Sequence, residues 1–101
     1  KENCPDLRNT RVVDIVKELG EYGMAAEVYD PWVDPAEAEH EYGITPIQIP
    51  APGTYDAIVV AVAHDQFKVL SDQGIRALGK REHVLYDLKY VLPRDAADLR
   101  L

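Results

Sequence analysis

The chain has 101 residues, of which 47% are hydrophobic and 29% charged, and its formal net charge is -7. This length suits one compact domain with one core and is too short for two domains. An acidic surface repels the phosphate backbone of nucleic acids, so we expect no DNA or RNA partner. A small phosphate-bearing ligand is still compatible with the composition, because a local pair of cations can hold one.

The cysteine content and the length of the hydrophobic runs indicate the cellular compartment in which the chain works. Cys4 is the only cysteine, so no intramolecular disulfide can form, which is typical of a reducing environment. No apolar run approaches the roughly 20 residues that span a bilayer, and the longest, "AIVVAVA", has the length of a strand. We therefore expect a cytoplasmic chain without membrane contact.

The first predicted element is a helix over residues 10–22. Asn9 or Thr10 is a suitable N-cap, and Gly20 or Gly23 a suitable stop. The apolar residues recur at the spacing of a single helix face, namely Val12, Val13, Ile15, Val16 and Leu19.

Three shorter elements follow. "MAAEVYD", residues 24–30, predicts a strand. A helix over 34–43 is indicated by Asp34 as N-cap, by Pro35 at the first helical position and by Gly43 after the last turn. "ITPIQI", residues 44–49, predicts an edge strand, because a proline inside it cannot donate to a sheet.

The second half contains the strongest strand signal. "YDAIVVAVAH", residues 55–64, is an unbroken apolar run, which is typical of a parallel strand covered on both faces. A helix over 65–78 is predicted next, broken near 71–74, and "HVLYDLK", residues 83–89, predicts another buried strand.

The order of elements predicts the fold class. Helices alternate with strands through short loops, which favours an α/β, Rossmann-like, three-layer, doubly wound and mostly parallel sheet of three or four strands. The first helix should follow a strand, and the sequence begins where that strand would end. We therefore expect residues 1–101 to be a domain cut from a longer protein, with its first strand truncated.

Ligands in open parallel sheets bind beyond the carboxyl ends of the strands. Lys1, Arg8 and Lys89 all fall at this predicted edge and could converge on a diphosphate. Arginine would bind it through a bidentate fork and lysine as a point charge. The alternative, three ordinary surface cations, is equally compatible with the pattern.

Other polar residues at this edge have simpler interpretations. Asp30 ends a strand where a Rossmann domain binds ribose, but no G-x-G-x-x-G turn precedes it, so a turn-forming role is favoured. His64 could be an acid–base group, although helix capping is favoured. Cys4 has no histidine nearby in sequence, which argues against a nucleophile. His40 and His83 lack partners at metal-ligand spacing, so no metal site is predicted.

Four stretches, "KENCPDLRNTRVVDIVKEL", "VYDPWVD", "YDAIVVAVAH" and "LYDLKYVL", resemble the C-terminal domain of the UDP-glucose/GDP-mannose 6-dehydrogenase family. The first two are most similar to the UDP-N-acetylhexosamine dehydrogenases, with the gluco and galacto epimers both open. The resemblance implies oxidation of C6 to a uronate for surface polysaccharides such as O-antigen and capsule.

The resemblance also implies an architecture. An N-terminal Rossmann domain would bind most of the NAD, a central segment would dimerise and supply the catalytic cysteine, and this chain would close over the UDP-sugar. The partners are then the UDP-sugar and the enzyme's own other domains, within a homo-oligomer. The chain alone is expected to be inactive, with no catalytic residue of its own.

The resemblance assigns roles to three residues. Lys1 matches a lysine that contacts the substrate, and Lys89 matches a substrate-contacting position that is more often arginine. Arg8 matches an arginine that reaches the NAD pyrophosphate. Two other interpretations are kept, a stand-alone nucleotide- or CoA-binding flavodoxin-like module and an acidic subunit-interaction domain.

Overall fold

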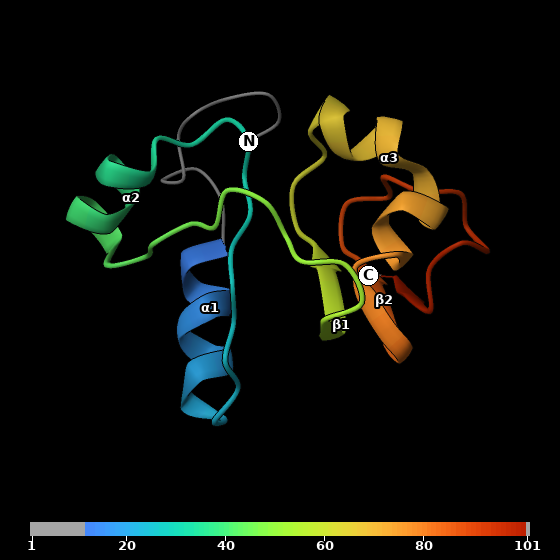
Figure 1. Ribbon diagram of the computed structural model, residues 1–101, viewed down its shortest axis with the longest axis horizontal. Coiled ribbons are helices and arrows are strands. Elements are labelled where there is room, and N and C mark those ends of the chain that lie inside the picture. Colours follow the sequence, from blue (N-terminus) through green and yellow to red (C-terminus); the bar gives the residue numbers. More distant parts are fainter. Residues whose placement is uncertain (1–11, 101) are drawn as a thin grey trace. The chain divides into compact units, whose positions relative to one another are not determined.

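The computed structural model describes residues 12–100, which form two compact units, residues 12–49 and 50–100 (Figure 1). No helix within this range is long and apolar enough to cross a membrane. The elements in chain order are α1 (Val12–Glu21), α2 (Pro35–Tyr42), β1 (Tyr55–Val60), α3 (Asp65–Arg76), β2 (Gly79–Asp87) and β3 (Leu99–Arg100).

Helix α1 in the first unit confirms the helix predicted there and ends at a glycine. Gly23 has φ +80, a left-handed conformation that costs glycine little. Its N–H donates to the carbonyl of Gly20 at 3.0 Å, and the N–H of Met24 donates to Leu19 at 3.0 Å. These two bonds form a Schellman motif, which satisfies carbonyls that the helix leaves free.

Helix α2 has the ends that the sequence predicts. The Asp34 carboxylate accepts the Ala36 N–H at 3.0 Å, and Pro35 follows as the first helical residue. Gly43 closes the helix in the left-handed region with φ 67, and its N–H donates to Glu39. Capping therefore sets both boundaries of this short helix.

The strands predicted over 24–30 and 44–49 are not formed. Both segments are extended or turn backbone, joined by a bond from the Ile47 N–H to the Val28 carbonyl at 2.8 Å. A strand is defined by a ladder of such bonds, and the described residues offer these segments no ladder. The prediction rested on apolar pattern and took no account of a pairing partner.

The second unit contains a three-stranded sheet in the order β1-β2-β3, with both pairs parallel. The parallel α/β class is confirmed. Strand β2 begins earlier than predicted, at Gly79. Strand β3 was not predicted, because it has only two residues.

The core of the second unit lies on one face of this sheet. Val60 of β1 and Leu85 of β2 pack there with Ile75 of α3 and with Leu92 of the segment after β2. The other face carries Val59, Val84 and Leu99, whose exposed fractions are 41%, 42% and 51%. Burial of the first face holds α3 and residues 91–97 against the sheet.

Two irregularities shape this unit. Helix α3 is kinked at Ser71, which has φ 63 and ψ 178, so the predicted break is confirmed. The register of β1 and β2 shifts between Tyr55 and Ala57, whose partners are Gly79 and Val84. Residues 80–83 therefore bulge out of the ladder, and a Cβ on Gly79 would overlap the His83 ring.

Candidate functional site

The candidate site is the edge of the sheet where the parallel strands end. Lys89 lies two residues after the end of β2 and is exposed there. His64 follows β1, and Asp30 lies in the first unit. Lys1, Cys4 and Arg8 lie outside the described residues, so their predicted roles stay predictions.

Asp87, the last residue of β2, organises the loop that carries Lys89. Its side chain is 0% exposed. One carboxylate oxygen accepts the N–H of Lys89 at 3.2 Å and of Val91 at 3.1 Å, and the other accepts the N–H of Leu92 at 2.9 Å. A buried carboxylate is costly unless it is hydrogen-bonded in this way.

The hydrogen bonds to Asp87 determine which groups of the loop are free to bind a ligand. The backbone N–H groups of Lys89, Val91 and Leu92 are already used by Asp87. With these three donors occupied, the exposed Lys89 side chain is the candidate group for binding an anion at the loop. The role of Asp87 in holding the loop appears only in the structure.

Tyr90 takes an unusual backbone conformation beside Lys89. Its φ is 55, in the left-handed region that non-glycine residues seldom adopt. Such a residue costs about 1–3 kcal/mol, and these residues gather at ligand-binding loops. The Tyr90 ring lies against the guanidinium of Arg100, 4.3 Å from the Cζ atom to the ring centroid. Neither the backbone conformation of Tyr90 nor its contact with Arg100 was predicted from the sequence.

His64 differs from its favoured prediction. It occupies the N-cap position of α3 with extended backbone, but its side chain makes no capping hydrogen bond. The ring is 0% exposed and packs on Phe67 with centroids 5.4 Å apart. The prediction that the side chain caps the helix is wrong, because burial against an aromatic ring competes with the cap.

Asp30 forms a turn, as the favoured interpretation stated. Its carboxylate accepts the Trp32 N–H at 2.8 Å, and its carbonyl accepts the Val33 N–H at 3.3 Å. A side-chain bond two residues along the chain is an Asx-turn. The turn leads into α2, whose N-cap is Asp34.

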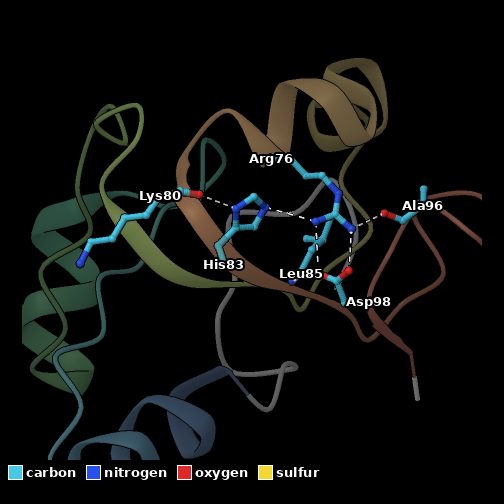
Figure 2. A network of polar contacts seen from close by, with 6 residues as sticks. All are labelled: Arg76, Lys80, His83, Leu85, Ala96 and Asp98. Carbon is cyan, nitrogen blue, oxygen red and sulfur yellow. Dashed lines mark hydrogen bonds and ion pairs between the residues drawn. The ribbon is translucent and has the colours of Figure 1, made fainter.

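A polar network fastens the C-terminal segment beside this site (Figure 2). Arg76 at the end of α3 donates to both oxygens of Asp98 at 3.0 and 3.1 Å, and to the Ala96 carbonyl at 2.8 Å. The second Asp98 oxygen also accepts the Leu85 N–H at 2.8 Å. Just before β3 begins, the Asp98 carboxylate thus accepts an N–H of β2 that would bind a backbone carbonyl in a regular sheet.

The charges of this pair shift each other's pKa. The hydrogen bonds from Arg76, with a smaller contribution from the Leu85 N–H, hold the pKa of the Asp98 carboxyl below its ordinary value. The same hydrogen bonds hold the pKa of Arg76 above its ordinary value. Both side chains are partly exposed, so solvent screens much of this interaction.

The network also fixes the tautomer of His83. The Nε2 atom lies 3.2 Å from Nη1 of Arg76, which can only donate, so Nε2 accepts. The Nδ1 atom lies 2.7 Å from the Lys80 carbonyl, which can only accept, so Nδ1 carries the proton. In Figure 2 the Lys80 side chain points away from the network. Its Nζ atom forms an ion pair with Asp56 at 3.0 Å.

Comparison with known proteins identifies the domain. The profile described as "UDP-glucose/GDP-mannose dehydrogenase family, UDP binding domain" matches residues 1–94. A UDP-N-acetyl-D-glucosamine 6-dehydrogenase of Pseudomonas aeruginosa is 62% identical over 101 residues, which is 100% of this chain and 24% of the relative. One from Salmonella typhi is 56% identical over 101 residues, with the same shares covered.

A more distant relative, Protein CapL of Staphylococcus aureus, is 36% identical over 95 residues, which is 94% of this chain and 22% of the relative. The chain therefore spans about a quarter of the length of the curated relatives it matches. The family profile covers nearly all of the chain, including the loop after β2. The chain belongs to the UDP-glucose/GDP-mannose dehydrogenase family, whose UDP binding domain it carries.

Proposed function

We propose that this chain binds the nucleotide end of a UDP-N-acetylhexosamine within an NAD-dependent 6-dehydrogenase. The observation that carries the proposal is the match of the UDP binding domain profile to residues 1–94, in a chain that is 62% identical to a UDP-N-acetyl-D-glucosamine 6-dehydrogenase. The product would be the uronate, used in surface polysaccharide synthesis. The other domains of a homo-oligomeric enzyme would be its partners.

The proposed ligand contacts are three cations. Lys89 would bind the UDP-sugar near its phosphates, from a loop that Asp87 holds in place through three hydrogen bonds. Lys1 would contact the same substrate, and Arg8 would reach the NAD pyrophosphate. The last two assignments rest on the sequence motif alone.

The chain contributes binding, and the redox chemistry lies elsewhere. NAD, held by the other domains, would supply the hydride acceptor for the two oxidations that take C6 from the alcohol to the carboxylate. The fold includes no G-x-G-x-x-G turn to hold a dinucleotide, so NAD would be bound mainly outside this chain. Energy from binding the remote nucleotide would position C6 at the cofactor, and closure would exclude water.

The proposal is tested with the protein at its full natural length. UDP-N-acetylglucosamine and NAD should yield two NADH per sugar, whereas UDP-glucose should react at least tenfold more slowly. Lys89→Ala should lower kcat/KM by about tenfold, because one cation–phosphate contact is worth about 1.4 kcal/mol. Lys17→Ala, an exposed lysine on α1, is the matched control.

Two results would contradict the proposal. A preference for CoA, with no NADH from any UDP-sugar, would favour a nucleotide-binding module. No response to any nucleotide would favour a subunit-interaction domain. Equal kcat/KM for the Lys89 variant and the parent protein would remove Lys89 from the site while leaving the activity itself standing.

A further inference from the structure

Arg100, the last residue of β3, lies at the same sheet edge as Lys89. Strands β2 and β3 are parallel, and Asp87 and Arg100 are register partners at their carboxyl ends. Residues in register leave the sheet on the same face. The Arg100 side chain therefore leaves the backbone next to Asp87, which holds the loop in place.

The surroundings of the Arg100 guanidinium are unusual for a surface cation. Its Cζ atom lies over the Tyr90 ring, 4.3 Å from the centroid. Its Nε atom is buried and has no hydrogen-bond partner within residues 12–100. A buried donor without an acceptor is unfavourable, and a bound anion is one way in which native proteins satisfy such a group.

Tyr90 gives the guanidinium a fixed direction. Tyr90 is held with φ 55 inside the loop that is tied by three bonds to Asp87. A stacked guanidinium keeps its planar edge free to donate, so the stack does not compete with a bidentate contact. The ring is 60% exposed, which leaves this side of the loop open to solvent.

The electrostatics of the loop favour an anion here. Lys89 is the neighbour of Tyr90 in the chain, and the Arg100 guanidinium lies against the Tyr90 ring, so two cationic residues belong to this part of the molecule. The Asp87 carboxylate at the end of β2 is buried and already accepts three N–H groups. Lys89 provides a point charge, whereas Arg100 provides the planar fork that matches two phosphate oxygens.

We propose that Arg100 is the second cation of the Lys89 site and binds the diphosphate of the UDP-sugar, with Tyr90 positioning its guanidinium. The inference rests on the proposed function for the identity of the ligand. It accounts for a lysine at position 89, because the arginine fork is supplied by the neighbouring strand. No bond forms or breaks in this step.

Calorimetric titration of the protein at its full natural length tests the proposal with three probes, UDP, inorganic pyrophosphate and uridine. Arg100→Gln should weaken binding of UDP and of pyrophosphate by about tenfold and leave uridine binding unchanged, since uridine has no phosphate. Arg100→Lys, which keeps the charge and loses the fork, should cost about threefold. Tyr90→Leu should also cost about threefold, through the lost stacking.

Arg94→Gln is the matched control, because Arg94 is an exposed arginine of the same segment, and its affinities should stay within about twofold. UDP binding that depends on Lys89 and is unchanged in Arg100→Gln and Arg100→Lys would overturn the inference alone. Arg100-dependent pyrophosphate binding without tighter binding of UDP would support the anion site and contradict the proposed function. No saturable binding of UDP or pyrophosphate by the parent protein would overturn both.

Discussion

Two Tyr-Asp pairs, Tyr29-Asp30 and Tyr86-Asp87, occur in similar sequence settings and have different structural roles. Asp30 is half-buried and accepts the Trp32 N–H in an Asx-turn. Asp87 is buried and accepts three N–H groups, which belong to residues in the range 89–92. The first forms a local turn, and the second holds the loop that carries Lys89 through three hydrogen bonds.

The comparison teaches that a strand-end aspartate indicates a site only through its context. Asp30 ends a segment with no strand ladder in the described part of the chain, and its carboxylate accepts a backbone N–H only two residues further along the chain. Asp87 ends β2 between β1 and β3, and its burial makes each of its hydrogen bonds costly to lose.

The largest expected effect is on stability, and it separates Asp87 from Asp30. Asp87→Asn replaces an acceptor oxygen by an NH2 group that faces a backbone N–H, so we expect a loss of about 3 kcal/mol in the free energy of unfolding. Asp30→Asn keeps an acceptor for Trp32 and should cost about 0.5 kcal/mol. Urea denaturation of both variants measures the difference, and equal losses would contradict it.

A second pair of variants compares glycines of the two regions. Gly79→Ala places a Cβ against the His83 ring within the β2 bulge and should destabilise by about 2 kcal/mol. Gly20→Ala lies in α1 with open space around the new methyl and should stabilise by about 0.5–1 kcal/mol. Thermal unfolding checks both signs, and stabilisation by Gly79→Ala would show that the bulge yields freely.

These contrasts show how far sequence reasoning reaches. The ends of α2 and the break in α3 were predicted, because caps and glycines act on neighbouring residues. Strand β3 was missed, since it is anchored by the Asp98 carboxylate and not by an apolar run. Lys89 could be placed by its position after a strand. Arg100 could not be placed at the sheet edge from the sequence, because its position depends on the register of β3, a strand for which the sequence contains no pattern.

The third prediction concerns function at the Asp87 loop. Lys89→Gln should weaken UDP binding about tenfold while the free energy of unfolding changes by less than about 0.5 kcal/mol, because the side chain is exposed. Asp87→Asn should weaken UDP binding as well, but together with stability. If Lys89→Gln lowered the free energy of unfolding as much as Asp87→Asn does, Lys89 would stabilise the fold and its effect on UDP binding would be indirect.

The smallest expected effect is a pH dependence at Asp98. Arg76 holds the pKa of folded Asp98 below its unfolded value, so the carboxylate stabilises the fold above about pH 4. That stabilisation is lost as the pH falls through the folded pKa. The stability difference between the parent chain and Asp98→Asn should therefore be largest near neutral pH and shrink in acid.

Asp95→Asn is the control for this experiment, since Asp95 is an exposed carboxylate of the same segment. Its stability difference from the parent should stay small at every pH. A difference for Asp98→Asn that is constant from pH 7 to pH 2 would mean that charge is not what fastens the C-terminal segment.

The most direct test of the central claim is an NMR titration of the amide signals with UDP-N-acetylglucosamine, taken into the millimolar range, with NAD and CoA as comparisons. We expect shifts gathered at Lys89, Tyr90 and Arg100, produced by the UDP-sugar and not by CoA. Shifts gathered away from the strand ends, or the same shifts with CoA, would contradict a UDP-sugar site at this edge.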